Sequence, residues 1–321
     1  MSLPPLPHYI TDYGHGIHAI DSGFGRPHFD AIHVVIENGR AAIIDTATNS
    51  SVPRLLVALE TLEIRPWQVD YVMLSHIHLD HAGSAGSLMA LMADARLVVH
   101  PRGARHMADP TKLIAGTIGV YGEEETRRMY GDILPIPAER IIEAQHLQTL
   151  DLAGRELLLL DTAGHSRHHI CIRDGRSGHI FAGDTFGISY PELNNQGRQF
   201  IFPTTTPVQF DPDALHQSVN LLLNYKPEAI YVTHYSQVTD IPRLGADLHR
   251  QIDLQVAMAL RERSGSGERH QRLHAGMAKI VQDEAAQHSW GLSGEPLLEL
   301  METDIELNAQ GLGSWLDTLE G

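Results

Sequence analysis

A dense group of metal-binding side chain types lies in the first third of the sequence. The segment Ser75–His81 reads Ser-His-Ile-His-Leu-Asp-His and directly follows an apolar run that is typical of a buried strand. Alternate side chains of an extended chain point the same way, so His76 and His78 can reach one metal ion. If a helix begins after them, Asp80 and His81 turn toward a neighbouring ion. Imidazole and carboxylate together suit zinc, iron or manganese.

Three further candidate ligands, His165, Asp184 and His234, each lie just after the end of a predicted strand. Strand ends along one edge of a sheet can bring residues together that are distant in sequence. Taken alone, a histidine in such a place is more often a hydrogen-bonded scaffold residue, and Gly-Asp is more often a turn. Their combination with the dense histidine cluster favours a metal site.

The order of these elements resembles that of the metallo-β-lactamase-fold hydrolase superfamily. The motif His-x-His-x-Asp-His is complete, and Gly-His, Gly-Asp and a histidine after a late strand follow it in the family's order, over residues 15–240. A strand ending in Asp45 resembles the family's structural aspartate, although Ala47 stands where glycine is common. The resemblance implies an α+β fold, a four-layer αββα sandwich with the metals at one edge of its two sheets.

The resemblance also implies two divalent metal ions, zinc in the first place, with iron or manganese as alternatives. The implied ligands form two sets that share one bridging carboxylate: His76, His78 and His165 for the first ion, Asp80, His81 and His234 for the second, and Asp184 for both. Two cations lower the pKa of bound water and polarise a substrate oxygen. Asp80 would in addition receive or relay the proton. Such chemistry needs no protein nucleophile, and Cys171 lies inside a predicted strand.

Other residues are expected beside the ligands rather than on the metal. His169 matches the second histidine of the family's Gly-His-x-x-x-His pattern and, like Asp45, is expected to support a ligand. Tyr190, Tyr235 and Phe186 are expected on the substrate side of the site.

Periodicity and turn signals, such as the hairpin signal Asn38-Gly39, predict how the chain is organised. Short strands and helices alternate through a predicted catalytic domain, residues 1–239, in which 101–145 form a helical cap or excursion and 186–210 a substrate-side loop. Aromatic residues of that loop either pack it onto the core or line a pocket for an acyl or aromatic group. Three helix-type segments, the last at Pro296–Asn308, then predict a C-terminal extension, residues 240–321, which would cover the core or form a homodimer interface.

The composition of the chain limits which kinds of partner it is expected to bind. A formal charge of −16 over 321 residues argues against nucleic-acid binding through charge, and a single cysteine excludes a disulfide framework. The N-terminal segment has no signal-peptide pattern, and no apolar run is long enough to cross a membrane. The chain is therefore expected to be cytoplasmic and to act on a small-molecule substrate, with no nucleic acid or membrane as partner.

Differences from the ligand motifs of other branches of the superfamily limit which reaction the chain is expected to catalyse. Penicillin-degrading relatives use a cysteine ligand or lack the bridging aspartate, whereas Asp184 is present here and Cys171 matches no ligand position. Flavodiiron oxidoreductases have glutamate where this chain has His78, and RNA-processing relatives need a basic surface or an RNA-gripping arm, of which the acidic sequence gives no sign.

The remaining relatives resemble glyoxalase II, lactonases and thioesterases. The sequence thus predicts a binuclear hydrolase whose metal-bridging hydroxide attacks the carbonyl of an ester, thioester or lactone, and not primarily a β-lactamase. Two alternatives stay open. One is a mononuclear iron oxygenase resembling persulfide dioxygenases, with a facial set of two histidines and an aspartate. The other is a non-catalytic regulatory protein with structural metals.

Overall fold

The computed structural model describes residues 6–205, 207–263 and 267–320. The chain folds into two compact units, each assembled from segments that are far apart in sequence. The first unit contains the residues up to 161 together with 168–183 and 233–236, and the second contains 162–167, 184–232 and the residues from 237 on.

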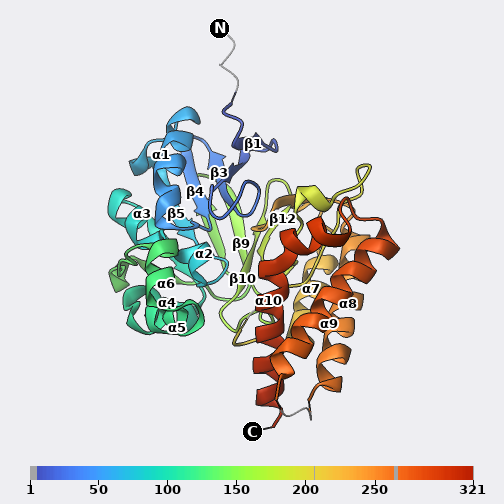
Figure 1. The fold of residues 1–321 in the computed structure, drawn as a ribbon. Coiled ribbons are helices and arrows are strands. Elements are labelled where there is room, and N and C mark those ends of the chain that lie inside the picture. Colours follow the sequence, from blue (N-terminus) through green and yellow to red (C-terminus); the bar gives the residue numbers. More distant parts are fainter. Residues whose placement is uncertain (1–5, 206, 264–266, 321) are drawn as a thin grey trace. The chain divides into compact units, whose positions relative to one another are not determined.

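A mixed sheet of seven strands organises the first unit (Figure 1). Its strands follow the chain order: β1 (Ile10–Asp12), β2 (Ile17–Asp21), β3 (Ala31–Glu37), β4 (Arg40–Ile44), β5 (Val69–Met73), β6 (Arg96–Val99) and β7 (Ile141–Glu143). The strands from β1 to β4 pair antiparallel, and those from β4 to β7 pair parallel. The Asn38-Gly39 turn between β3 and β4 has positive φ at both residues, the conformation that a tight two-residue hairpin needs.

Helices follow the parallel strands of this sheet. They are α1 (Val52–Thr61), α2 (Leu79–Ala82), α3 (Ala85–Leu91), α4 (Pro101–Ala108), α5 (Thr111–Tyr121) and α6 (Glu123–Tyr130), with short 3-10 turns η1 (Asn49–Ser51), η2 (Pro66–Gln68) and η3 (Ala138–Arg140). The segment 101–145, predicted as a helical cap or excursion, contains α4, α5 and α6 and then β7, a strand that the sequence analysis did not predict. Strand β7 forms because its backbone extends the ladder of β6.

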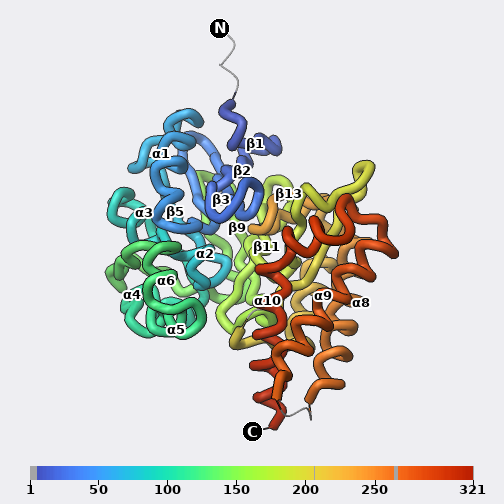
Figure 2. The backbone as a smooth tube through the Cα atoms, in the orientation of Figure 1, coloured from blue at the N-terminus to red at the C-terminus, as the bar shows by residue number. Residues whose placement is uncertain are grey.

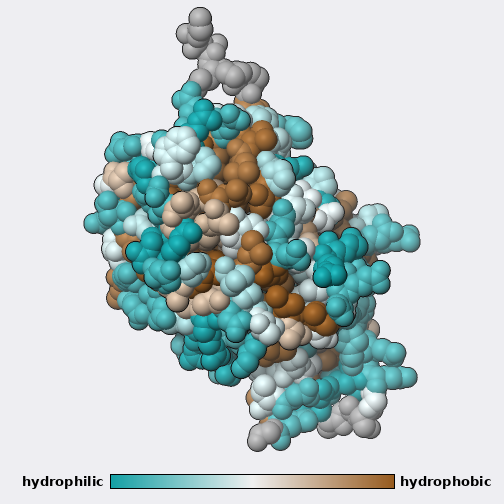
Figure 3. All heavy atoms as spheres, turned by 90° about the vertical axis from the view of Figure 1, so that its left-hand side faces the viewer, coloured by the Kyte–Doolittle hydropathy of each residue, from teal (hydrophilic) through white to brown (hydrophobic). Residues whose placement is uncertain are grey.

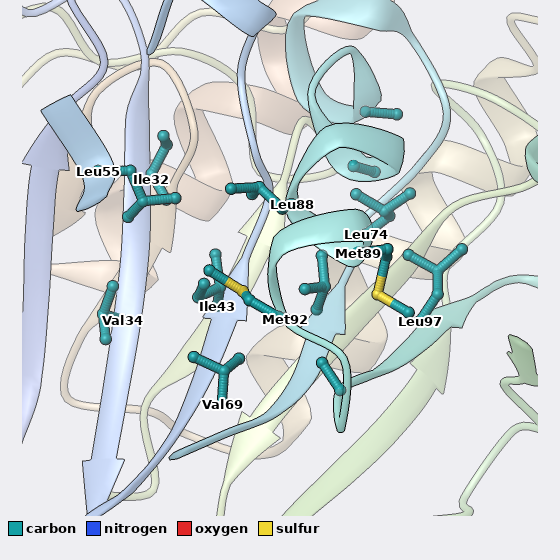
Figure 4. Close-up of a cluster of buried hydrophobic side chains, with 14 of the residues drawn as sticks. Ile32, Val34, Ile43, Leu55, Val69, Leu74, Leu88, Met89, Met92 and Leu97 are labelled. Atoms are coloured by element: carbon teal, nitrogen blue, oxygen red, sulfur yellow. The ribbon is translucent and has the colours of Figure 1, made fainter. Parts of the chain in front are cut away.

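The core of the first unit lies between the sheet and its helices. Figure 4 shows Leu88 and Met89 of α3 gathered with Ile43 of β4 and Leu74, which follows β5. Leu88, Ile43 and Leu74 are completely buried. Each such side chain contributes roughly 1.5–3 kcal/mol to the stability of the fold. This packing fixes the end of β5, from which the histidine motif starts.

Four more strands of the first unit pair antiparallel in the order β11-β10-β9-β8. They are β8 (Thr149–Leu152), β9 (Arg155–Asp161), β10 (Ile170–Asp174) and β11 (Ile180–Gly183). Arg155 of β9 forms a buried two-pronged ion pair with Asp174 of β10, with both N–O distances at 2.6 Å. The same guanidinium donates to the carbonyl of His15 at 2.7 Å, which ties this sheet to the hairpin before β2.

The second unit is mainly helical. It contains η4 (Pro191–Leu193), α7 (Pro212–Asn224), β12 (Ile230–Val232), β13 (Ser236–Val238, of which the first residue belongs to the first unit), α8 (Ile241–Arg261), α9 (Arg269–His288) and α10 (Gly294–Thr318). Helices α8, α9 and α10 lie against one another (Figure 2). The expected C-terminal helices are therefore present. Helix α10 continues past Asn308, where the predicted helix ends, because Leu312 and Leu316 are buried and this burial outweighs the cost of Gly311 and Gly313.

Some sequence expectations fall on residues outside the described ranges. These are residues 1–5 of the N-terminal segment, residue 206 of the predicted loop and residues 264–266 of the break before α9. In the part of the chain that the structure describes, no helix is both long and apolar enough to span a membrane. The face in Figure 3 shows apolar groups bordered by polar side chains.

Candidate metal centre

The histidine motif begins after the end of β5 and continues into α2. Extended backbone continues through His78, which has φ −62° and ψ 146° and is the N-cap residue of α2. Nε2 of His76 lies 2.9 Å from Nδ1 of His78, and the two rings meet edge to face. Both imidazoles therefore turn toward a common point, as alternate residues of an extended chain should. Helix α2 then redirects Asp80 and His81.

A second group of donors joins this helix to a distant segment of the first unit. The ligand atoms of Asp80, His81 and His234 all lie within 4.8 Å of one another. Oδ2 of Asp80 is 3.5 Å from Nε2 of His81 and 3.4 Å from Nε2 of His234. Nδ1 of His234 donates to the carbonyl of Phe29 at 3.0 Å, which orients the ring with Nε2 toward Asp80. Fixing one imidazole nitrogen in this way is how proteins orient a metal-binding histidine.

Asp45 organises the residues around that group. Its Oδ1 accepts the backbone N–H of Ser75 at 2.8 Å, and its Oδ2 accepts the hydroxyls of Ser75 at 2.8 Å and Thr233 at 2.7 Å. The same Oδ2 lies 2.8 Å from Nδ1 of His81. Asp45 thus connects Ser75, two residues after β5, with Thr233, the residue after β12, and contacts the ring of His81 as well.

Two adjacent histidines pack against the motif from the start of β10. The buried ring of His169 stacks on His76 with 5.0 Å between centroids, which suits the supporting role expected of it. His168, to which the sequence analysis gives no role, also contacts both His76 and His78, at 6.2 Å and 5.8 Å between centroids. The close packing of His169 requires Gly183, where a Cβ atom would lie 2.7 Å from Nε2 of His169.

His165 and Asp184 belong to the second unit. Both are buried, and Nε2 of His165 lies 3.6 Å from Oδ2 of Asp184. On the other side of the ring, Nδ1 of His165 lies 2.8 Å from the hydroxyl of Thr204, which orients the imidazole. Sequence reasoning missed Thr204 because it lies in an irregular loop 39 positions away from its partner. The second unit therefore brings one predicted histidine and one predicted carboxylate together.

The residues predicted on the substrate side have different surroundings. Phe186 and Tyr190 are completely buried, and the hydroxyl of Tyr190 lies 3.3 Å from Oδ1 of Asp304 in α10. Phe200 of the same loop packs edge to face on Trp290 at 4.8 Å. These aromatic residues therefore pack within the second unit. Tyr235, in the first unit, is half-buried.

Two tyrosines of the helical cap, which the sequence analysis did not single out, lie within electrostatic reach of Asp80. Burial raises the pKa of Tyr121 to about 12, and the nearby negative charge of Asp80 adds to this effect. Burial likewise raises the pKa of Tyr130 well above its ordinary value, again with a contribution from Asp80. The two rings lie 6.4 Å apart. Both phenols therefore stay protonated at neutral pH and can act as hydrogen-bond donors.

The chemistry of the donors suits a metal centre. The first unit provides four imidazoles and one carboxylate from two segments, and the second unit provides one imidazole and one carboxylate. Within the first unit, the donor atoms of Asp80, His81 and His234 gather closely enough to hold an ion. Neutral imidazole with carboxylate accommodates zinc, iron or manganese.

Comparison with known proteins agrees with the motif. The family model that matches residues 27–234 describes the metallo-beta-lactamase superfamily. The chain is 23% identical over 229 residues to the metallo-beta-lactamase fold-containing protein ST1585 of Sulfurisphaera tokodaii, a match that covers 68% of this chain and 78% of that protein. A hydroxyacylglutathione hydrolase of Polaromonas is 25% identical over 183 residues, 56% of each chain.

Solved structures share the fold. The crystal structure of ST1585 superposes with a TM-score of 0.64 at 21% identity, covering 93% of this chain and 98% of its own. That of the metallo-beta-lactamase family protein TTHA1429 from Thermus thermophilus gives a TM-score of 0.65 at 18% identity, covering 95% and 94%. These likenesses confirm the predicted α+β fold of the αββα type with a C-terminal helical extension.

Proposed function

Because the chain belongs to the metallo-β-lactamase superfamily, we propose that it is a binuclear metal-dependent hydrolase of ester, thioester or lactone bonds. Two bound divalent ions, most simply zinc, would supply a hydroxide at neutral pH and polarise the substrate carbonyl. The proposed ligands are His76, His78 and His165 for one ion, Asp80, His81 and His234 for the other, and Asp184 for both.

One observation supports this proposal more than any other. The ligand atoms of Asp80, His81 and His234 lie within 4.8 Å of one another. These three residues are of the types, and in the order, that the family motif requires. More than half of the predicted catalytic domain separates His234 from the other two residues in sequence. Their proximity therefore results from the tertiary fold and not from neighbouring positions in the chain. The paired rings of His76 and His78 lie just before Asp80 and His81 in the chain.

Residues of the chain itself would carry out the proton transfer and bind the substrate. Asp80 faces the imidazoles of both His81 and His234, and it would hold or relay the proton that leaves the attacking water. Tyr121, whose phenol accepts a hydrogen bond from Tyr130 and stays protonated at neutral pH, would donate a hydrogen bond to a substrate.

The name of one relative supports the proposed class of reaction. The matched segment of the Polaromonas protein belongs to a hydroxyacylglutathione hydrolase, although at 25% identity it supports only the class of reaction. A small-molecule substrate and a cytoplasmic location remain our proposals. So does a homodimer through the C-terminal helices, which light scattering on purified protein would test.

Metal analysis together with a substrate panel tests the proposed function. We expect two zinc, iron or manganese ions per chain and turnover of at least one ester, thioester or lactone. The Asp184→Asn variant should lose one of the two ions and reduce kcat/KM by at least about 100-fold, whereas Asp213→Asn, at an exposed site of the same unit, should retain both.

The alternatives give different results. One iron per chain with consumption of oxygen would support the iron oxygenase, and two ions without turnover of any substrate would support a regulatory protein. Retention of both metal and activity by Asp184→Asn would contradict the ligand set.

A further inference from the structure

A pair of histidines outside the proposed ligand set joins two helices of the second unit. His216 of α7 and His249 of α8 stack with 4.9 Å between ring centroids and 16° between ring planes. Nδ1 of His216 lies 2.6 Å from Nδ1 of His249. Both side chains are partly exposed, so an ion from solution can reach them.

The outer nitrogen of each ring faces an oxygen from the opposite helix. Nε2 of His216 lies 3.2 Å from Oδ1 of Asp253 in α8, and Nε2 of His249 lies 3.1 Å from Oδ1 of Asn220 in α7. Each helix thus contributes a histidine and, four residues later, the acceptor for the other helix's histidine. Residues four apart lie on the same face of a helix. His216 and Asn220 of α7 therefore face His249 and Asp253 of α8.

These contacts determine where the protons lie. A carboxylate oxygen and an amide oxygen only accept hydrogen bonds, so each Nε2 carries a hydrogen and donates it. Each neutral ring then has its lone pair on Nδ1, and both lone pairs point into the same gap. Two facing lone pairs repel each other, so the gap favours a cation, which is either a shared proton or a metal ion.

The surroundings disfavour the proton. Burial lowers the pKa of His249, and the nearby His216 lowers it further, against the smaller opposing effect of Asp253. At neutral pH the ring of His249 is therefore predominantly neutral. Neutral imidazole is the form that binds metals.

We propose that His216 and His249 together bind a divalent late transition-metal ion, Zn²⁺, Ni²⁺ or Cu²⁺, through their two Nδ1 atoms. Asp253 and Asn220 hold the rings in the required tautomer, as a carboxylate or amide does behind many metal-binding histidines. Nitrogens bound to one tetrahedral zinc ion lie about 3.4 Å apart, given Zn–N bonds of about 2.0–2.1 Å. The rings would separate by less than about 1 Å, which partly exposed side chains can do, and water would complete the coordination.

Copper binding to protein whose proposed centre is already filled with zinc tests this site. We expect the wild type to bind one Cu²⁺ per chain more than His216→Gln/His249→Gln does. Its electron paramagnetic resonance spectrum should show coupling to two nitrogens, which needs no variant for its interpretation. Ni²⁺ should also raise the Tm of the wild type but not that of the double variant, because an ion bound to the folded form alone stabilises it.

Two further variants separate the site from ordinary surface histidines. His270→Gln/His274→Gln removes a histidine pair on α9 whose Nε2 atoms face glutamates of α10, so it should leave the copper signal unchanged. Asn220→Leu keeps both ligands but removes an orienting oxygen, and it should weaken copper binding about 10–100-fold.

Equal copper stoichiometry in the wild type and in a folded His216→Gln/His249→Gln variant would overturn the proposal. So would a wild-type spectrum with no coupling to two nitrogens and no shift in Tm, because the pair would then share only a proton. Neither readout depends on hydrolytic activity, so failure of the proposed function would leave this test unaffected.

Discussion

Oδ2 of Asp45 lies 2.8 Å from Nδ1 of His81, and the opposite nitrogen of that ring lies 3.5 Å from Asp80. A carboxylate behind the imidazole fixes its tautomer and increases its basicity as a ligand. Asp45 also accepts the hydroxyl of Thr233, the residue before His234. One buried carboxylate therefore positions donors from two segments that are distant in sequence.

The Asp45→Asn variant should bind metal more weakly. Its amide N–H would face the hydroxyl of Thr233 or the N–H of His81, where the wild type offers an acceptor. We expect a loss of about 10–100-fold in metal affinity and of about 1–3 kcal/mol in the free energy of unfolding. Chelator competition and urea denaturation measure the two effects.

Thr233→Val provides the control for Asp45. It removes one donor to the same oxygen but leaves the contact with His81 in place, so stability should fall by about 1 kcal/mol while metal affinity changes little. If Asp45→Asn retained the metal affinity of the wild type, Asp45 would serve only the scaffold.

Gly183 should tolerate no side chain. A Cβ at this position would lie 2.5 Å from Cβ of Ser75, and its φ of +47° is unfavourable for other residues. We expect Gly183→Ala to lower the free energy of unfolding by about 2–4 kcal/mol, because both strain and overlap must be relieved. Thermal denaturation measures the loss.

Gly14→Ala is the matched control for Gly183. Gly14 also has a positive φ, +74°, but nothing lies within 4 Å of an added Cβ, so only the conformational cost of about 1 kcal/mol should remain. Equal losses at both positions would mean that the close approach to Ser75 has no role.

Local signals made much of the scaffold predictable. The apolar run before Ser75, the Asn38-Gly39 turn and the spacing of His76 and His78 each act within a few residues, and each appears in the structure where the pattern predicted it. The family order of later motifs indicated which strand ends to examine. Such signals depend on backbone conformation, which neighbouring residues largely determine.

Long-range contacts were not predictable from one sequence. Thr204 orients His165 from an irregular loop, and no spacing marks a threonine for that role. Helix α10 continues through Gly311 and Gly313 because tertiary burial of Leu312 overrides local preference. The assignment of His165 and Asp184 to the metals remains a prediction that substitution must test.

Stability at acidic pH should depend on Asp174. Burial alone raises the pKa of this carboxyl, but hydrogen bonds from Arg155 and Ser177 outweigh it, so its pKa lies below the ordinary value. A carboxyl with a lowered folded-state pKa stabilises the protein above the unfolded pKa of about 3.9, and this stability is lost as the pH falls through the folded value.

Asp174→Asn would leave the buried guanidinium of Arg155 without its carboxylate. We expect it to cost about 3–5 kcal/mol at pH 7, and the difference from the wild type should narrow as the pH falls from about 5 toward about 2. Urea denaturation at several pH values measures this, with Asp94→Asn, an exposed carboxylate, as the control that shows no such trend. A difference that widened at low pH would contradict the assigned direction.

Thr204 should act on the proposed metal centre through the orientation of His165, because its other contact, with the backbone carbonyl of Asp184 at 3.5 Å, is longer. Its hydroxyl lies 2.8 Å from Nδ1 of that ring, so Thr204→Val removes the contact while retaining the shape of the side chain. The ring would keep the longer contact of its Nδ1 with the backbone carbonyl at position 204, 3.3 Å away, but it would be held less firmly, so we expect metal affinity to fall about 10-fold or more. Thr204→Ser keeps the hydroxyl and should restore the affinity, which a purely steric role would not produce. Unchanged affinity in Thr204→Val, measured by chelator competition, would show that His165 is oriented by other contacts or is not a ligand.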